Sequence, residues 1–235
     1  MKLINFCYFL IFLAFIGCGE VKPSEKALDS TPSITDSKTS VVADSQHVIM
    51  FFGNSLTAGL GVTPEESFPG QIAQRLDSLG YPYRVINAGL SGETTASGMN
   101  RISWVLREKP DVFILELGAN DGLRGIALEE TKKNLEQIVE EVKNANPEVT
   151  LILTGMQIPP NMGPEYTETF KNLFPELAEA HDLLLVPFLL DGVGGIPELN
   201  QADGIHPTPK GHQILAENVW QVLFPVLQNA DSDIH

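Results

Sequence analysis

Three short polar segments of this 235-residue chain contain residue types that could carry out nucleophilic chemistry. The first is Gly53-Asn54-Ser55-Leu56, which directly follows an apolar run over residues 47–52. A serine on a tight strand-to-helix turn presents its hydroxyl at the edge of a sheet, and the positive end of the helix dipole favours an anion that forms there. Ser55 could instead be a helix N-cap, because serine is common at that position.

The second and third segments could supply a base and an oxyanion donor. In Asp203-Gly204-Ile205-His206-Pro207, a carboxylate and an imidazole three residues apart around a glycine can meet. The carboxylate would then hold one ring nitrogen and leave the other free to act as a base; a polar loop with a capping Asp is the alternative. In Gly118-Ala119-Asn120-Asp121-Gly122, the Asn120 amide could donate to an oxyanion, or the segment could be an ordinary turn.

Several other chemistries are disfavoured by the sequence. The net charge of −15 argues against nucleic acid as a partner, because binding phosphate backbones requires clustered Lys and Arg. The sequence contains no HxxxH, CxxC or carboxylate cluster and no GxxxxGK[ST] motif, so we expect no metal, no cofactor and no phosphoryl transfer from ATP. The remaining histidines have no carboxylate neighbour framed as in the Asp203 segment; they are His47, His181, His212 and His235.

The elements that must position these segments follow from hydrophobic patterning. Short apolar runs predict five strands, at 47–52, 84–87, 111–116, 150–154 and 183–186. Apolar residues at helical spacing predict helices at 68–79, 96–107, 128–144, 166–181 and 211–227. Near-continuous apolar strands indicate a sheet covered on both faces, so we expect an α/β fold: a three-layer αβα sandwich around a mostly parallel five-stranded sheet. In such sheets the site forms at the carboxyl ends of the strands.

The N-terminal segment resembles an export signal. Lys2 precedes an apolar run over 6–16, which is too short to span a bilayer, and Gly17-Cys18-Gly19 follows. A small residue before a cysteine resembles the lipobox of bacterial lipoproteins, in which that cysteine is lipidated; Phe15 stands where the pattern usually has Leu. An ordinary signal peptide cut elsewhere is the alternative. We predict a lipoprotein signal peptide at 1–17, a lipid-anchored flexible linker at 18–45, a catalytic domain at 46–228 and a C-terminal tail at 229–235.

Taken together and in order, the polar segments resemble the conserved blocks of the SGNH/GDSL hydrolase superfamily. Gly53-Asn54-Ser55-Leu56 is similar to block I, residues 87–94 to block II, Gly118-x-Asn120-Asp121 to block III and Asp203-x-x-His206 to block V. The chain most resembles the bacterial arylesterase, acyl-CoA thioesterase I and lysophospholipase L1 group, over about residues 47–226. The resemblance extends to the fold, which in this superfamily is flavodoxin-like.

The resemblance implies a role for each of these residues. Ser55 would be the nucleophile, His206 the general base and Asp203 its orienting carboxylate. The oxyanion hole would consist of the Ser55 and Gly92 backbone N–H groups and the Asn120 side chain. One residue departs from the family pattern, because Asn54 occupies the position that usually holds Asp. This change leaves the reaction class intact and raises a question about the surroundings of the nucleophile and the pH optimum.

These inferences predict a serine esterase that acts on short- to medium-chain acyl esters, thioesters or lysophospholipids. We expect it to be exported and anchored in a bacterial membrane through Cys18, facing the periplasm or the cell surface. The Pro-rich loop at 156–164 would border the acyl site or simply form a rigid connection. Two alternatives stay open at this point: an esterase that removes acetyl groups from glycans, and a catalytically silent binding lipoprotein on the same scaffold. The sequence leaves the oligomeric state unknown.

Overall fold

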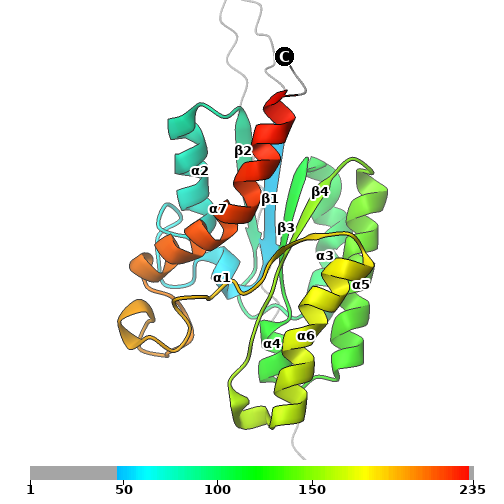
Figure 1. The fold of residues 1–235 in the computed structure, drawn as a ribbon, viewed down its shortest axis with the longest axis vertical. Coiled ribbons are helices and arrows are strands. Elements are labelled where there is room, and N and C mark those ends of the chain that lie inside the picture. Colours follow the sequence, from blue (N-terminus) through cyan, green and yellow to red (C-terminus); the bar gives the residue numbers. More distant parts are fainter. Residues whose placement is uncertain (1–46, 233–235) are drawn as a thin grey trace, which may run out of the picture. The chain divides into compact units, whose positions relative to one another are not determined.

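A five-stranded parallel sheet forms the centre of the computed structural model, which describes residues 47–232 (Figure 1). The strand order is β2-β1-β3-β4-β5, and all four strand pairs are parallel. The strands are β1 (His47–Gly53), β2 (Tyr83–Gly89), β3 (Val112–Glu116), β4 (Thr150–Thr154) and β5 (Leu184–Val186). This confirms the predicted fold class and all five predicted strands. The predicted signal peptide, Cys18 and the linker lie outside the described residues.

Helices cover both faces of the sheet. Helices α2 and α7 pack together on one face, and α3, α5 and α6 pack side by side on the other. The helices are α1 (Ser55–Ala58), α2 (Phe68–Leu79), α3 (Thr95–Val105), α4 (Ala119–Leu123), α5 (Leu128–Ala145), α6 (Pro164–Ala180) and α7 (Pro209–Ser232). Three 3₁₀ turns complete the set: Leu106–Glu108, Pro160–Met162 and Pro197–Leu199. Short α1 and α4 were not predicted, because one helical turn leaves no periodic apolar pattern.

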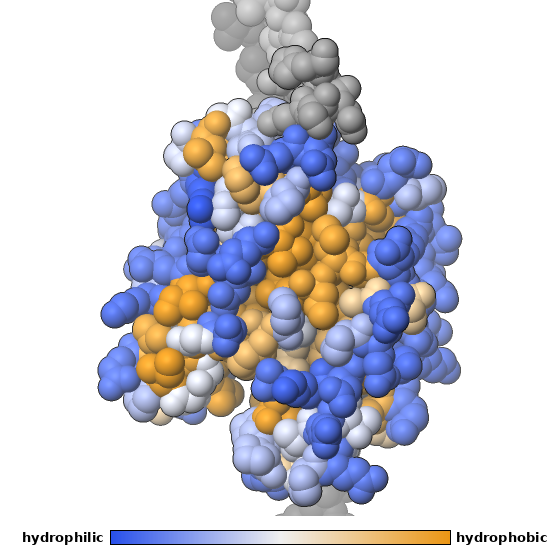
Figure 2. All heavy atoms as spheres, in the orientation of Figure 1, coloured by the Kyte–Doolittle hydropathy of each residue, from blue (hydrophilic) through white to orange (hydrophobic). Residues whose placement is uncertain are grey.

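The central strands are apolar because neither face meets water. Every residue of β3 is buried, as is every residue of β1 after His47, and Phe51, Phe52 and Phe113 have no exposed surface. On the helices only the inner stripe is apolar: in α5 this stripe includes Leu135, Ile138 and Val139, all fully buried. Hydrophobic side chains gather between the helix layers, framed by the hydrophilic outer faces (Figure 2).

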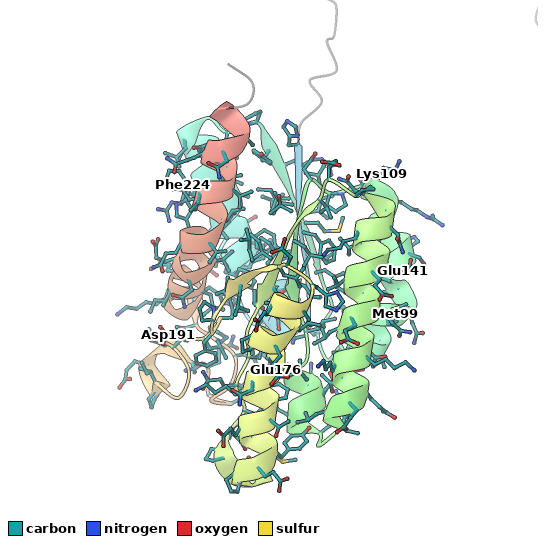
Figure 3. The ribbon with its side chains drawn as sticks, turned by 45° about the vertical axis from the view of Figure 1, so that its right-hand side comes forward. Met99, Lys109, Glu141, Glu176, Asp191 and Phe224 are labelled. Atoms are coloured by element: carbon teal, nitrogen blue, oxygen red, sulfur yellow. The ribbon has the colours of Figure 1, made fainter. Side chains whose placement is uncertain are left out.

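The outer helix faces carry much of the chain's negative charge. Glu141 on α5 and Glu176 on α6 are exposed and lie on the side of their helices away from the sheet (Figure 3). No helix within residues 47–232 is long and apolar enough to cross a membrane.

Local signals fix where the helices begin and end. Ser67 caps α2, since its hydroxyl accepts a hydrogen bond from the Gly70 N–H at 3.2 Å, and Gly80 ends the helix with φ of 75°. Helix α3 ends at Val105 rather than at residue 107, because the chain tightens there into the 3₁₀ turn. Helix α7 begins at Pro209, earlier than predicted, and continues to Ser232. Proline is well suited to a first helical position.

A buried histidine joins α7 to the start of α2. The His212 side chain has 1% of its surface exposed, and its Nδ1 accepts a hydrogen bond from the Phe68 N–H at 3.2 Å. Its ring also stacks on the Phe68 ring, with centroids 6.2 Å apart. Burial, with a smaller contribution from the charge of His206, lowers the pKa of His212 to about 4. The neutral ring is therefore the form that the fold requires.

We predict that His212 makes the fold acid-sensitive. The unfolded chain binds this proton below about pH 6.5, whereas the folded protein binds it only near pH 4, so stability is lost as the pH falls through this window. The loss should reach about 3 kcal/mol. In urea unfolding between pH 7 and 4, the stability advantage of wild type over His212→Asn should shrink by about that amount. An advantage that does not change with pH would contradict the prediction.

Candidate active site

The turn between β1 and α1 presents Ser55 at the carboxyl edge of the sheet. Asn54 is the N-cap of α1: its Oδ1 accepts a hydrogen bond from the Leu56 N–H at 3.0 Å. Ser55 is therefore the first residue of the helix rather than its cap, which excludes the alternative that the sequence left open. Only 9% of Ser55 is exposed, and it lines a pocket. The Ser55 hydroxyl therefore does not cap the helix, and it is accessible from the pocket.

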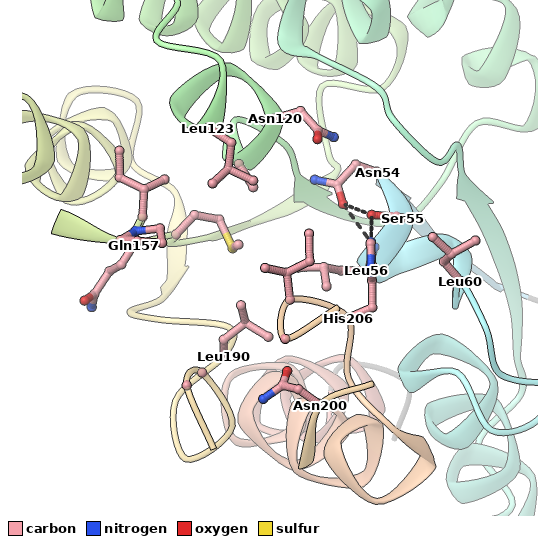
Figure 4. A pocket seen from close by; sticks show the side chains of 18 of the residues that line it. Asn54, Ser55, Leu56, Leu60, Asn120, Leu123, Gln157, Leu190, Asn200 and His206 are labelled. Atoms are coloured by element: carbon pink, nitrogen blue, oxygen red, sulfur yellow. Dashed lines mark hydrogen bonds between the residues drawn. The ribbon is translucent and has the colours of Figure 1, made fainter. Parts of the chain in front are cut away.

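His206 lies between Ser55 and Asp203. Its Nε2 is 2.9 Å from the Ser55 Oγ (Figure 4). Its Nδ1 is 2.7 Å from the Asp203 Oδ2. The second carboxylate oxygen of Asp203 accepts hydrogen bonds from the backbone N–H groups of Ile205 and His206, each at 3.0 Å. Gly204, with φ of 76°, allows the tight turn that brings these groups together. The structure therefore joins all three predicted residues in one hydrogen-bonded chain.

The protonation state of Asp203 sets the tautomer of His206. Hydrogen bonds from the His206 side chain and from two backbone N–H groups lower the pKa of Asp203 to about 2. The ionised carboxylate can only accept hydrogen bonds, so the His206 Nδ1 must carry a hydrogen. In the neutral ring the Nε2 then has a free lone pair facing the serine hydroxyl. This arrangement can remove the hydroxyl proton.

Gly92 and Asn120 reach the same pocket from two other strand ends. Gly92 follows β2 and has φ of 81°, a conformation that favours glycine. The Asn120 Nδ2 donates to the Glu93 carbonyl at 2.9 Å, and an Arg124 N–H donates to the Gly92 carbonyl at 3.1 Å. An amide nitrogen has two hydrogens, so Asn120 retains one for a ligand. The three predicted oxyanion donors, Ser55, Gly92 and Asn120, therefore all line the same pocket.

Buried polar contacts tie the Gly92 loop to α3 and α4. The Glu93 carboxylate has no exposed surface and binds Arg101, which also donates to the Ala88 carbonyl at 2.7 Å. Asp121, next to Asn120, accepts hydrogen bonds from the N–H and the hydroxyl of Thr95 at 2.9 and 2.6 Å. These contacts join residues 8 to 26 positions apart in the sequence, and no local pattern predicted them. They hold Gly92 and Asn120 in register with each other.

The pocket beside Ser55 is a mainly apolar cavity of about 620 Å³. Leu123 and Leu190 lie across it from Asn54, Ser55 and His206 (Figure 4). Its apolar lining consists of Leu56, Leu60, Ala119, Leu123, Met156, Ile158, Pro159, Phe188, Leu190 and Ile205. The predicted loop contributes residues 156–159, whereas Pro160–Met162 forms a 3₁₀ turn that does not line the pocket. Phe188 and Leu190, which follow β5, were not predicted.

Glu116, the last residue of β3, lies fully buried beneath the serine turn. Burial raises its pKa to about 7, although hydrogen bonds from Thr57 and Asn54 act in the opposite direction. The sequence places Glu116 at the end of the third predicted strand and suggests no role for it. The available signal was an acidic residue closing an otherwise apolar strand that ends at the site edge.

His47 and His181 lie apart from this site. His47 begins β1, at the opposite end of the strand from Ser55, and its Nδ1 is 3.3 Å from Asp111. His181 is 4.0 Å from Glu136. Both therefore have a carboxylate partner that the sequence did not suggest, but neither contacts a nucleophile. Within residues 47–232 no group of three or more His, Cys, Asp or Glu side chains could hold a metal ion.

Comparison with known proteins identifies the family. Residues 51–214 match the GDSL-like lipase/acylhydrolase family. The chain is 41% identical over 180 residues to esterase TesA of Pseudomonas aeruginosa, covering 76% of this chain and 89% of that protein. It is 35% identical over 185 residues to an arylesterase of Vibrio mimicus, covering 78% and 92%.

Solved structures agree with the sequence relatives. A crystal structure of TesA superimposes with a TM-score of 0.73 at 39% identity, covering 76% of this chain and 99% of that one. The psychrotrophic esterase EstA from Pseudoalteromonas, inhibited by monoethylphosphonate, also gives a TM-score of 0.73, at 29% identity over 77% of this chain and 99% of that one. The matching segment contains every residue of the site described above. The chain therefore belongs to the GDSL-like lipase/acylhydrolase family.

Proposed function

We propose that this chain is a serine esterase that hydrolyses acyl esters through a covalent acyl-enzyme on Ser55. The observation that carries the proposal is the unbroken Ser55–His206–Asp203 chain of hydrogen bonds, at 2.9 and 2.7 Å, opening onto an apolar pocket. Membership of an acylhydrolase family and relatives named esterase and arylesterase support the reaction class. An intact triad geometry also argues against a silent binding protein.

In the proposed reaction, the Ser55 Oγ attacks the ester carbonyl carbon while the His206 Nε2 takes its proton. Asp203 stabilises the imidazolium that forms. The carbonyl oxygen becomes an oxyanion and accepts hydrogen bonds from the Ser55 and Gly92 N–H groups and the Asn120 amide. When the intermediate collapses, the alcohol leaves with the proton from His206. Water then attacks the acyl-enzyme by the same steps and releases the acid.

We propose that the acyl chain occupies the apolar pocket, which favours short- to medium-chain esters. Most of its side chains offer methyl, methylene or aromatic groups; Asn54 and His206 provide polar groups in contact with Ser55, and Gln157 and Asn200 lie elsewhere in the lining (Figure 4). A relative in Escherichia coli is named thioesterase 1/protease 1/lysophospholipase L1 and is 34% identical over 185 residues, which supports thioesters and lysophospholipids as further substrates. Hydrolysis rates with p-nitrophenyl esters from acetate to dodecanoate should rise beyond acetate. A maximum at acetate would contradict the assignment.

The experiment that tests the reaction is labelling with a fluorophosphonate. Wild-type protein should be labelled at Ser55, and Ser55→Ala should abolish both labelling and p-nitrophenyl ester hydrolysis, because no other side chain occupies the nucleophile position. His212→Asn, which alters a buried histidine outside the site, should still be labelled. Absence of labelling in folded wild-type protein would contradict the esterase assignment.

We also propose that the protein is exported and anchored through a lipid on Cys18. The basic start, the apolar run over 6–16 and the Gly17-Cys18 pair support this. An anchored enzyme would meet acyl lipids directly. Mass spectrometry of protein from a bacterial membrane fraction should find an N-terminal Cys18 carrying acyl chains, and a mature protein that starts at another residue would contradict the proposal.

A further inference from the structure

The Glu116 carboxylate accepts four hydrogen bonds from the turn that carries Ser55. Three reach its Oε2: from the Asn54 N–H at 3.0 Å, the Thr57 N–H at 3.3 Å and the Thr57 Oγ1 at 2.8 Å. The fourth comes from the Asn54 Nδ2 to the Oε1, at 2.7 Å. Ser55 lies between Asn54 and Thr57 in the sequence, so the Glu116 carboxylate binds the turn on both sides of the nucleophile.

The orientation of the Asn54 amide follows from its neighbours. Its Oδ1 accepts from the Leu56 N–H at 3.0 Å, and a backbone N–H can only donate. The Nδ2 must therefore face Glu116, so that a donor meets an acceptor. The Asn54 Oδ1 is also 3.4 Å from the Ser55 Oγ, a longer approach than the 2.9 Å to His206. Asn54 thus connects Glu116 directly to the surroundings of the nucleophile.

Gly53 allows this close packing. A methyl group at residue 53 would lie 2.1 Å from the Thr57 Oγ1, 2.5 Å from the Glu116 Oε2 and 2.6 Å from the Glu116 carbonyl oxygen. These distances are far shorter than any van der Waals contact. The cluster is therefore built around the missing side chain, and Glu116 could not reach the turn beside a larger residue.

We propose that Glu116 and Asn54 form a matched acceptor–donor pair that positions Ser55 for attack. The inference rests on the proposed esterase function and names two positioning residues for it. Glu116 has no exposed surface and does not line the pocket, so it acts through the turn and does not touch the substrate. Above its pKa of about 7, the ionised Glu116 carboxylate satisfies all four donors without a proton of its own.

The pair also explains what the departure from the family pattern does. With Asp at residue 54, a carboxylate oxygen would replace the Nδ2 and face the Glu116 Oε1 at about the same short distance. Two carboxylates so close cannot both be ionised, so one proton would have to be held between them. Asn54 supplies the hydrogen itself. The serine turn then keeps its geometry at pH values at which a shared proton would be lost.

The neighbouring ionisable groups have their own partners. Glu93 binds Arg101, Asp121 binds Thr95, and Asp203 binds His206 on the far side of Ser55. Within residues 47–232, the hydrogen-bond partners of the Glu116 carboxylate are Asn54 and Thr57, and neither side chain ionises at ordinary pH. The proton balance of the cluster is therefore set by residues 54 and 116.

Exchanging the amide of Asn54 and the carboxylate of Glu116 tests whether the two residues act as a pair. Glu116→Gln should place an amide against the Asn54 amide, donor to donor, and lower kcat about 10- to 100-fold above pH 7, where wild-type Glu116 is ionised, because a displaced nucleophile loses its attack geometry. Asn54→Asp should be active at acidic to neutral pH and lose activity as the pH rises, when the shared proton is lost. The double variant Asn54→Asp/Glu116→Gln restores an acceptor facing a donor. Its kcat should recover to within about fivefold of wild type, with no alkaline loss.

The measurements are kcat and KM for a p-nitrophenyl ester from pH 6 to 10, together with the rate of fluorophosphonate labelling and the Tm of each variant. Glu217→Gln, which removes an exposed partner of Arg75, is the matched control and should leave kcat unchanged. If Glu116→Gln does not fold, the pH profiles of Asn54→Asp and of the double variant still test the pair. A double variant no more active than the worse single variant would overturn the proposal, as would an Asn54→Asp profile identical to wild type. Wild-type protein that is not labelled at all would instead overturn the esterase function.

Discussion

Replacing His206 with Ala should lower kcat for p-nitrophenyl ester hydrolysis about 10⁵- to 10⁶-fold while leaving KM within a few-fold. The His206 Nε2 is 2.9 Å from the Ser55 Oγ, and no other imidazole in the described part of the chain contacts this hydroxyl. Without the base, the hydroxyl must lose its proton to water as it attacks. The loss is large because proton removal and return occur in both the acylation and the deacylation step.

A second histidine variant, His212→Asn, is the control. It shows whether the loss of activity comes from removing the base or from losing any histidine near α7. His212→Asn changes a buried histidine six positions further along the chain and should retain most of the activity at pH 7. A His206→Ala variant that kept more than about a hundredth of wild-type kcat would show that another group removes the proton. Circular dichroism and Tm should confirm that both variants are folded.

The sheet and the site could be predicted from the sequence for related reasons. An apolar run such as residues 47–52 is stable only when both of its faces are buried. Burial on both faces is typical of strands in parallel sheets. In a parallel sheet, the residues that follow the strands meet at one edge, so Ser55 and Asn120 were expected there because each follows a predicted strand. Gly92 was assigned through the family resemblance. Asp203 and His206 are only three residues apart, and a glycine between them makes the contact local.

Contacts between segments distant in the sequence could not be predicted in the same way. Glu116 appeared as the polar end of a strand, and its role depends on a turn 62 positions away in the sequence. Part of the pocket lining comes from Phe188 and Leu190, in a segment with no periodic pattern and no motif. The resemblance identified Asn54 as a departure but could not reveal its partner, because hydrogen-bond direction requires both groups to be placed.

Replacing Asn120 with Ala should lower kcat about 10²- to 10³-fold with little change in KM, because the oxyanion exists only in the transition state and its intermediates. Asn120 lines the pocket beside Ser55, and one of its two amide hydrogens is engaged by the Glu93 carbonyl at 2.9 Å. The other is available to the carbonyl oxygen of the substrate as charge develops there. Fluorophosphonate labelling should slow in parallel, since that reaction also places negative charge on an oxygen bound to the attacked atom.

The Asn120 amide also tethers the Gly92 loop, so its two roles must be separated. Arg124→Met removes a different tether of the same loop, the 3.1 Å hydrogen bond to the Gly92 carbonyl, and leaves the Asn120 amide in place. If Asn120 acts mainly as an oxyanion donor, Arg124→Met should cost only a few-fold in kcat, within the range of an exposed hydrogen bond worth about 1 kcal/mol. Equal losses in the two variants would assign the effect to loop position. A much larger loss in Asn120→Ala would assign it to charge stabilisation at the oxyanion, and the three donors that follow β1, β2 and β3 would then act as one preorganised site.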